Sequence, residues 1–295
     1  MSTWISPAKL NLYLAVTGIR ESDGFHELDS LVTLLDFGDT LTLTRSTDGG
    51  DHFSCNTPEL AWDSRNLLYQ ALERYRSICD YDVPLTLELE KRIPLGAGLG
   101  GGSSNASTLL LALNSLNPEP LPVQRLCELS AELGSDCPLF FYRGLLRMRG
   151  RGEQIEQING SLEDQLRNRS VLVFHPGFPV SAAWAYQQLR QGYPSGYTAH
   201  ETVAQELQHW LCHQRPWYSC ARNDLSPVVD HKYVAIPTLR TELRERFGLE
   251  SFMSGSGSAC FAWTDSKSDS IAITECIREC WGPTAWIQLC RIMTD

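Results

Sequence analysis

The chain is poor in lysine, lacks a glycine-lysine pair and has no long apolar run. Only four of its 25 basic residues are lysines, so a mechanism that needs a lysine has few candidates: Lys9, Lys91, Lys232 and Lys267. A Walker A loop requires Gly-Lys, and the absence of that pair excludes the P-loop nucleotide-binding proteins. The longest purely aliphatic run, 109–113, is far shorter than the roughly 20 residues of a membrane-spanning helix.

The charge balance is acidic, and the cysteines follow no known motif. Asp and Glu number 35 against 25 Lys and Arg, a net charge of −10 that disfavours nucleic acid and anionic membranes as partners. None of the ten cysteines forms a CxxC pair, which argues against a zinc knuckle or a redox motif and favours buried free thiols in a reducing compartment. The N-terminus lacks a basic region followed by an apolar stretch, so we expect a cytoplasmic protein.

The first half of the chain alternates in the manner of half-buried strands. Apolar residues alternate with others over 10–16, as Leu10, Leu12, Leu14 and Val16, and over 39–45 Leu41 and Leu43 point inward. The turn Asp23-Gly24 between these segments indicates antiparallel pairing. Lys9 and Asn11 therefore point the same way. The spacing over 64–78 predicts a helix with Ser64 as its N-cap. Residues 85–90 form another alternating strand, which runs directly into a glycine-rich segment.

The remaining pattern mixes helices and strands, which favours an α+β fold over a doubly wound parallel sheet. We expect Gly134 to cap a helix that carries Leu126 and Leu129. The polar stretch 157–169 predicts a boundary between domains 1–160 and 161–295. The other expected elements are a helix ending at Asn117, a strand over 171–174, helices over 181–190 and 200–213, a strand over 259–263, a helix over 269–280 and a strand over 285–292.

The glycine-rich segment combines five glycines within seven residues, followed by serines and a helix. Unhindered backbone N–H groups and the positive end of a helix dipole make this an anion site, and a flexible linker is the alternative. Ser103 or Ser104 can add a hydroxyl donor, and Ser104 is the candidate ligand of Mg²⁺. The residues expected to bind the nucleotide are Pro94, Leu95, Gly96, Ala97, Gly98, Leu99, Gly100, Gly101, Gly102, Ser103 and Ser104.

The same segment satisfies G-x-G-x-x-G at Gly96, Gly98 and Gly101, so an NAD(P)-binding oxidoreductase is an alternative. A dinucleotide-binding unit would need a fully apolar first strand, whereas this strand carries Thr86, Glu88 and Glu90 on one face.

Motifs along nearly the whole chain resemble the GHMP kinases. Pro94 to Ser107 is similar to their second motif. Ser6 to Leu12, with Asp23 to His26, resembles the opening of one branch, which acts on 4-diphosphocytidyl-2-C-methyl-D-erythritol. The further matching segments are 134–138, 175–177, 223–225 and the third GHMP motif at 254–259.

This resemblance implies a two-domain fold with the active site between the domains. The N-terminal domain would be like domain 2 of ribosomal protein S5, and the C-terminal domain would be α/β-plait-like. It also implies ATP-dependent phosphorylation of the substrate's 2-hydroxyl in the non-mevalonate isoprenoid pathway, with Mg²⁺, in a monomer or weak homodimer. Another GHMP small-molecule kinase of the mevalonate, homoserine or sugar type, and a non-catalytic nucleotide-binding protein, remain alternatives.

The resemblance also implies roles for individual residues. Asp136 matches the catalytic aspartate and Lys9 the catalytic lysine, while Asn11 and His26 match substrate contacts, His26 with the polar edge of cytosine. An aspartate can orient the acceptor hydroxyl and take its proton late, and a compact cation can keep that aspartate ionised. The alternatives are a turn residue for Asp136, a solvated strand lysine for Lys9 and a turn histidine for His26.

Two aromatic residues complete the expected cytosine site. Phe25 offers a ring for base stacking, and Tyr186 resembles the second stacking aromatic of the family, although it could instead be a helix core residue beside Trp184. The chain departs from the family in having Phe25 where Tyr is common, and the turn 20–23 is one residue longer than usual.

Three arginines form a second departure from the family. Arg147, Arg149 and Arg151 share one strand face where small apolar residues are expected. That pattern indicates a solvated face, with a contribution to a diphosphate site as the alternative.

Overall fold

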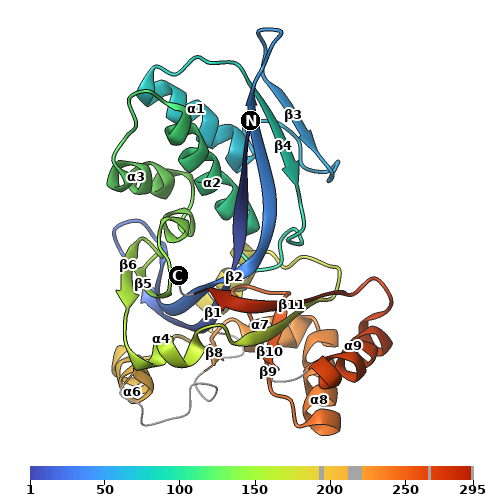
Figure 1. Cartoon of the computed structure of the whole chain (residues 1–295). Helices are drawn as coiled ribbons and strands as arrows, with labels where there is room; N and C mark the ends of the chain where they lie inside the picture. Colours follow the sequence, from blue (N-terminus) through green and yellow to red (C-terminus); the bar gives the residue numbers. More distant parts are fainter. Residues whose placement is uncertain (193–195, 212–220, 265–266, 294–295) are drawn as a thin grey trace. The chain divides into compact units, whose positions relative to one another are not determined.

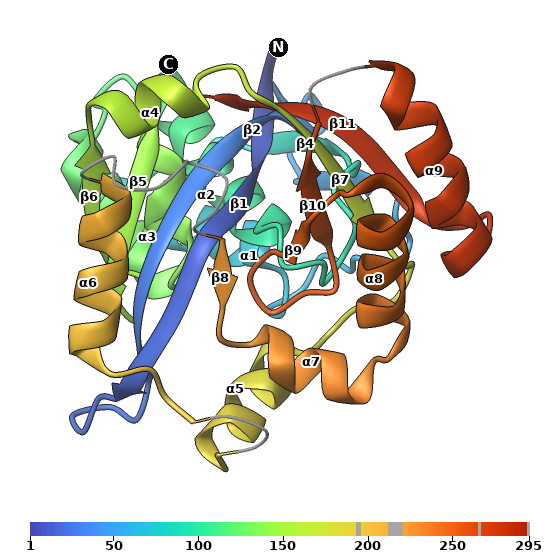
Figure 2. The ribbon, with the colours of Figure 1, turned by 90° about the horizontal axis from the view of Figure 1, so that it is seen from below.

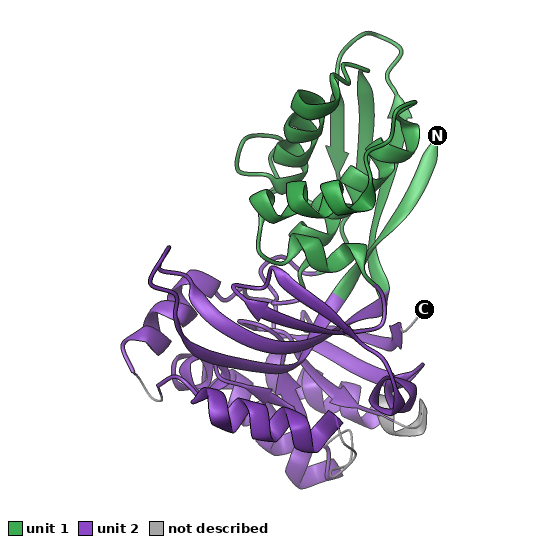
Figure 3. Cartoon of the chain, turned by 90° about the vertical axis from the view of Figure 1, so that its left-hand side faces the viewer, with its two compact units in different colours: residues 1–8, 37–93, 100–142 green, residues 9–36, 94–99, 143–295 purple. Residues whose placement is uncertain are grey.

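The computed structural model describes residues 1–192, 196–211, 221–264 and 267–293 (Figure 1). The chain forms two compact units, each assembled from separate stretches (Figure 3). Unit 1 contains residues 1–8, 37–93 and 100–142, and unit 2 contains residues 9–36, 94–99 and 143–295. The chain therefore passes from unit 2 to unit 1 within the glycine-rich segment, between Leu99 and Gly100. The division at residue 160 stays a prediction.

Unit 1 is a small sheet covered by helices. Strand β4 (Leu85–Glu90) pairs antiparallel with residues 40–45 of β2 (His26–Arg45) and parallel with the edge strand β3 (His52–Cys55). Leu41 and Leu43 are buried as their alternation predicts. The helices of this unit are α1 (Leu67–Cys79), α2 (Gly101–Leu116), α3 (Val123–Leu133) and the 3₁₀ helix η1 (Cys137–Phe141).

The core of unit 1 joins the leucine face of the sheet to the apolar faces of these helices. Leu87 from β4, Tyr75 from α1, Leu109 from α2 and Leu129 from α3 are all buried in it. Burial of a side chain of this size stabilises the fold by about 1.5–3 kcal/mol. Helix α2 is therefore fixed by its own packing, and its N-terminal turn has a defined place above the sheet.

The cap of one helix differs from its sequence prediction. The N-cap of α1 is Asn66, whose side chain accepts a hydrogen bond from the N–H of Leu68, and the prediction of Ser64 was wrong. Both residues are good caps, but helical geometry starts only at Leu67 because Asn66 also donates to the carbonyl of Ala61. Gly134 caps α3 as expected, in extended rather than left-handed backbone.

Unit 2 is a larger sheet with helices on one face. Strand β7 (Ser170–His175) pairs antiparallel with β11 (Trp286–Met293) and β10 (Cys260–Trp263), and β10 pairs with β9 (Ser251–Met253). Helices α8 (Ala235–Phe247) and α9 (Lys267–Trp281) lie beside these strands (Figure 2). Their buried residues, such as Leu239 and Ile277, pack with Leu172 and Phe174 of β7.

The rest of unit 2 surrounds the first hairpin of the chain. Strand β1 (Ser2–Ile19) and β2 are joined by the expected turn, in which Gly24 N–H donates to the Arg20 carbonyl. The remaining elements are β5 (Leu145–Gly150), β6 (Gln154–Ile158), α4 (Ser161–Leu166), α5 (Ala182–Arg190), α6 (His200–Leu211), β8 (Arg222–Asn223) and α7 (Ser226–Lys232).

The α+β prediction is confirmed, because helices combine with strands whose pairs in the described residues are mostly antiparallel. The expected boundary stretch 157–169 contains the end of β6 and all of α4. Residues 212–213 of the helix expected over 200–213 lie outside the described residues. Within the described part of the chain, no helix is both long enough and apolar enough to span a bilayer.

Candidate functional site

Lys9 and Asn11 lie together on one face of β1, as their alternation predicts. The Lys9 ammonium donates a hydrogen bond to Oδ1 of Asn11, and both residues are buried, with exposed fractions of 4% and 7%. Asn11 Nδ2 donates to Oγ of Ser30 at 2.9 Å, and that hydroxyl donates to the carbonyl of Tyr13 at 2.6 Å. Lys9 is therefore a buried and hydrogen-bonded side chain, which excludes its interpretation as a solvated strand lysine.

The first part of the glycine-rich segment, residues 94–99, is fixed by neighbouring backbone of unit 2. The Leu99 carbonyl accepts from Lys9 N–H at 3.0 Å, and the Ala97 carbonyl accepts from Ala259 N–H at 3.0 Å. Gly98 has φ of +79°, and a Cβ there would lie 2.2 Å from the Ser254 carbonyl oxygen. Glycine is thus required by packing as well as by backbone conformation, and the segment is no flexible linker.

The second part of the segment opens helix α2 in unit 1. Gly100, with φ of +71°, is its N-cap and makes no side-chain cap bond. The N–H groups of the first turn have no intrahelical partner, and they carry the positive end of the helix dipole. A Cβ on Gly101 would lie 3.1 Å from the Lys91 ammonium. This turn therefore offers backbone donors at the positive end of the helix dipole, which suits an anion.

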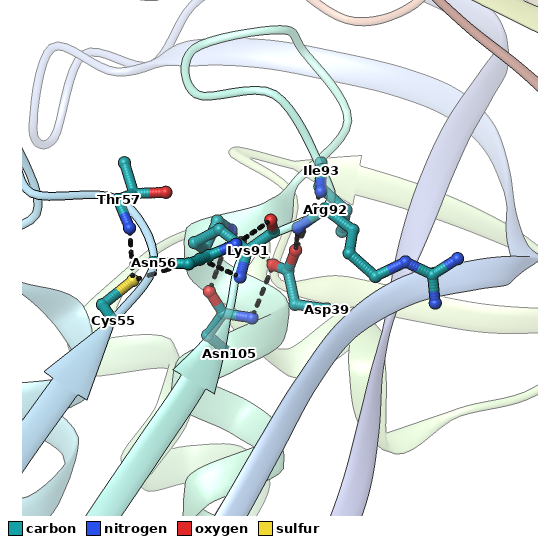
Figure 4. Close-up of polar contacts among 8 residues, drawn as sticks. All are labelled: Asp39, Cys55, Asn56, Thr57, Lys91, Arg92, Ile93 and Asn105. Atoms are coloured by element: carbon teal, nitrogen blue, oxygen red, sulfur yellow. Dashed lines mark hydrogen bonds and ion pairs between the residues drawn. The ribbon is translucent and has the colours of Figure 1, made fainter.

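A buried polar cluster of Asp39, Lys91 and Asn105 supports this turn (Figure 4). Asp39 accepts hydrogen bonds from the Lys91 ammonium, from Asn105 Nδ2 at 2.8 Å and from the N–H groups of Arg92 and Ile93 at 2.7 and 2.8 Å. Asn105 Oδ1 also accepts from Lys91 at 3.1 Å. The carboxylate thus ties β2, the end of β4 and the first turn of α2 into one structure.

The sequence pattern does not predict this cluster. The scarcity of lysine was the only signal, and it could have drawn attention to Lys91, which stands three residues before Pro94. Nothing in the local pattern links it to Asp39, 52 positions earlier in the chain.

The residues at the start of α2 can be compared with the ligands that a magnesium ion uses. Among the described residues, no group of three or more His, Cys, Asp or Glu could hold a metal ion. The buried Ser104 hydroxyl has no hydrogen-bond partner in the described part of the chain, whereas Ser103 is half-buried. Mg²⁺ usually takes one or two protein ligands beside phosphate oxygens and water. These residues fit an ion that arrives with the nucleotide.

Asp136 lies in unit 1, in the turn between α3 and η1, where it is the half-buried N-cap residue of η1. The next residue, Cys137, is anchored from both sides. Its N–H donates to the Gly134 carbonyl at 3.1 Å, and its carbonyl accepts from Ser107 Oγ of α2 at 2.7 Å. Burial raises the pKa of the Cys137 thiol to about 11, so this cysteine is a packed thiol and no nucleophile. Asp136 and the start of α2 thus share one unit, while Lys9 belongs to the other.

The predicted cytosine-site residues gather in unit 2. The ring centroids of His26 and Tyr186 are 4.8 Å apart with planes tilted by 32°. Tyr197, which the sequence analysis missed, meets His26 edge-on at 5.9 Å. Within the described residues, His26 Nε2 is buried without a hydrogen-bond partner, and burial lowers the pKa of His26, with Arg190 adding to the effect. The imidazole is therefore neutral at neutral pH, with an unused polar atom.

About half of Phe25 is exposed. The guanidinium of Arg151 lies 5.3 Å from the centroid of its ring. Arg147 forms two hydrogen bonds to Asp29, at 2.9 and 2.7 Å, and Arg149 pairs with Glu156. Arg147 and Arg149 are therefore not simply solvated. They link β5 to β2 and β6 through these ion pairs.

Comparisons with known proteins show the family of the chain. The chain matches the GHMP kinases N terminal domain over residues 66–144 and the GHMP kinases C terminal domain over residues 206–282. It is 36% identical to 4-diphosphocytidyl-2-C-methyl-D-erythritol kinase of Synechococcus sp. (strain CC9311), covering 95% of this chain and 93% of that protein. The same kinase of Methylacidiphilum infernorum (isolate V4) is 34% identical, with 98% and 96% covered.

Solved structures give the same result. A crystal structure of 4-(cytidine 5'-diphospho)-2C-methyl-D-erythritol kinase superposes with a TM-score of 0.76 at 30% identity, covering 98% of this chain and 99% of that one. A mevalonate kinase superposes at 0.72 with 12% identity, which shows the shared fold alone. The expected two-domain GHMP kinase fold is confirmed, and the NAD(P)-binding alternative is wrong, because the glycine-rich segment belongs to a kinase domain. The chain belongs to the 4-diphosphocytidyl-2-C-methyl-D-erythritol kinases of the GHMP kinase family.

Proposed function

We propose that this protein transfers the γ-phosphoryl group of ATP to the 2-hydroxyl of 4-diphosphocytidyl-2-C-methyl-D-erythritol. The observation that carries the proposal is the buried Lys9 and Asn11 pair, held beside Gly98 of the glycine-rich segment. A fixed cation beside such a segment can supply the positioning and the charge stabilisation on which phosphoryl transfer depends.

In this proposal the start of α2 binds the phosphates of ATP. The free N–H groups of Gly101, Gly102 and Ser103 in the first helical turn donate to phosphate oxygens. The Asp39 and Lys91 pair beneath them holds that turn in place. Mg²⁺, bound chiefly by the phosphates with Ser104 as its candidate protein ligand, would neutralise charge on the transferred group.

Asp136 and Lys9 act on the acceptor. Asp136 accepts a hydrogen bond from the 2-hydroxyl, orients its oxygen towards the γ-phosphorus and takes the proton as the new O–P bond forms. The bond between the γ-phosphorus and its bridging oxygen breaks, and ADP leaves. Lys9 attracts the acceptor oxygen and the γ-phosphoryl oxygens, and Asn11 fixes the direction of its ammonium.

His26 and Tyr186 recognise the cytosine ring. The neutral His26 imidazole has a buried Nε2 without a partner in the described part of the chain, which suits one hydrogen bond to the polar edge of the base. Tyr186 and the exposed ring of Phe25 provide stacking surfaces, each worth about 1–3 kcal/mol for a base on an aromatic ring. These contacts would favour binding of this substrate over mevalonate or homoserine, which carry no nucleobase.

A coupled assay of ADP release tests the proposal. We expect ADP release that depends on the diphosphocytidyl substrate, and no release with mevalonate, homoserine or galactose. Asp136→Asn keeps the shape of the side chain and removes its basicity, so kcat should fall roughly 10²–10⁴-fold. Asp164→Asn, at an exposed carboxylate of α4, is the matched control and should leave kcat unchanged. An Asp136→Asn variant with normal turnover would refute the role of Asp136.

We also propose that the protein is a monomer or a weak homodimer in the cytoplasm and binds neither nucleic acid nor membrane. The net charge of −10 supports the last two points. Sedimentation velocity over a hundredfold range of protein concentration tests the oligomeric state. A stable tetramer at the lowest concentration would contradict it.

A further inference from the structure

The turn over residues 253–259 lies directly against Lys9 and Asn11 in unit 2. A Cβ on Gly255 would be 3.2 Å from the Lys9 ammonium and 3.3 Å from Asn11 Oδ1. The Ser254 hydroxyl is fully buried, accepts from the Asn11 N–H at 3.2 Å and donates to the Gly98 carbonyl at 3.2 Å. The place of this turn therefore determines the surroundings of the Lys9 ammonium.

Asn223 holds this turn on both sides of Ser254. Its Nδ2 donates to the Met253 carbonyl at 2.8 Å and to the Gly255 carbonyl at 2.7 Å. Its Oδ1 accepts from the N–H of Leu225 at 2.9 Å. Only an amide offers two donors and one acceptor in this geometry, whereas a carboxylate would face two carbonyl oxygens without a hydrogen to donate.

Asn223 is itself fixed to the strand that carries Lys9. Strand β8 pairs parallel with β1, with Asn223 opposite Leu14. The next residue, Asp224, donates its N–H to the Leu14 carbonyl at 2.9 Å and accepts from the Val16 N–H at 2.9 Å. Asn223 thus links the turn to β1, the strand that carries Lys9. The turn and the Lys9 side chain are therefore both positioned by β1.

We propose that Asn223 is a positioning residue that holds the 253–259 turn over the Lys9 ammonium. The structural part of this inference stands on the contacts above, and its catalytic consequence rests on the proposed function. Loss of the amide removes both bonds to the turn, which leaves Lys9 more accessible and its ammonium less precisely placed. Misplacement by about 1 Å is enough to slow a phosphoryl transfer by as much as 10²-fold.

Lysine labelling tests the structural part without any need for activity. The full chain is treated with a limiting amount of acetic anhydride, and acetylation of its four lysines is followed by peptide mass spectrometry. Lys232, which is exposed, serves as the internal reference. In Asn223→Ala we expect Lys9 to be acetylated at least threefold faster relative to Lys232 than in the wild type. An unchanged ratio in this folded variant would overturn the proposal.

Two further variants sharpen the labelling experiment. Asn114→Ala is the matched control, because Asn114 also clamps backbone, donating to the Leu121 carbonyl at 3.0 Å and accepting from its N–H at 2.7 Å, but in unit 1. Its Lys9 ratio should equal that of the wild type. Asn223→Asp replaces the amide without loss of volume and should also expose Lys9. If both variants at Asn223 failed to fold, the amide would hold the whole fold, which contradicts a local positioning role.

A double-mutant cycle tests the catalytic part. Asn223→Ala should lower kcat about tenfold or more and change both KM values by less than about threefold. On a Lys9→Met background, Asn223→Ala should lower kcat only a little further, since the amide acts through Lys9. If the losses in kcat from the two substitutions were additive, Asn223 would not act through Lys9, and the catalytic part of the proposal would be overturned. Absence of turnover in the wild type would contradict the proposed function instead, and the labelling ratio would still decide the role of Asn223.

Discussion

The ammonium of Lys9 donates to the side-chain oxygen of Asn11 inside unit 2, two residues away on the same strand face. Both side chains are buried, and the hydrogen bond to Asn11 helps to fix the direction of the ammonium. A cation fixed in buried surroundings attracts an anionic group more strongly than a solvated one does.

Removal of this cation should slow the reaction with little effect on ATP binding. In Lys9→Met we expect kcat to fall roughly 10²–10³-fold, because the charge acts on the transition state, while the KM for ATP changes little. Initial rates over a grid of both substrates measure this. Lys232→Met removes an exposed lysine that lies 4.2 Å from the Trp184 ring centroid, and kcat should stay normal. A large rise in the KM for ATP with normal kcat in Lys9→Met would contradict the assigned role.

Loss of the Lys91 cation beside the first turn of α2 should instead destabilise unit 1. Lys91→Met leaves the buried Asp39 carboxylate without its charge partner, and we expect a loss of about 3–5 kcal/mol in the free energy of unfolding. Urea denaturation at pH 7 measures it. Adding Asp39→Asn keeps an oxygen acceptor for the N–H groups of Arg92 and Ile93 and removes the unpaired charge. The double variant should therefore be more stable than Lys91→Met, and equal or lower stability would refute this explanation.

Gly98 should tolerate no side chain. In Gly98→Ala the new Cβ would meet the Ser254 carbonyl at 2.2 Å in backbone with positive φ, so we expect destabilisation by at least about 1–3 kcal/mol and a raised KM for ATP. Gly18→Ala is the control, because nothing lies within 4 Å of its Cβ position. Thermal unfolding and ATP titration of both variants make the comparison. Equal behaviour of the two would show that the segment adapts freely.

His175 should make the protein less stable in acid. Burial lowers the pKa of His175 from 6.5 to about 4, so between these values the unfolded chain binds a proton that the folded chain does not. Stability from this group is present above pH 6.5 and is lost as the pH falls towards 4, by about 3 kcal/mol. His175→Asn keeps an acceptor for the Gly177 N–H, and its unfolding free energy should fall less over this range. Parallel pH profiles of the two proteins would contradict the assignment.

Short-range patterns predicted the fold well. The alternation of Leu85, Leu87 and Leu89 predicted a strand with one buried face, and these residues are buried in unit 1. The cap of α1 was misplaced because Ser64 and Asn66 are both good caps, and the bond from Asn66 to the Ala61 carbonyl favours the later start. The local sequence does not contain that bond.

Long-range relations in the site could be predicted only in part. The shared face of Lys9 and Asn11 followed from strand periodicity, since they are two residues apart. The contact between His26 and Tyr186 joins residues 160 positions apart, and only the family resemblance related them. The hold of Asn223 on the 253–259 turn, and the passage between units at Leu99 and Gly100, depend on packing that no local pattern records.

The most direct test of the account is the structure of the product. The wild-type protein, Mg²⁺, ATP and 4-diphosphocytidyl-2-C-methyl-D-erythritol are incubated together, and the products are followed by ³¹P and ¹³C nuclear magnetic resonance. The account predicts one new phosphomonoester, coupled to C2 of the erythritol moiety, formed in equal amount with ADP while the diphosphate stays intact. Consumption of ATP without this phosphomonoester, or its appearance on a different hydroxyl, would contradict the central claim.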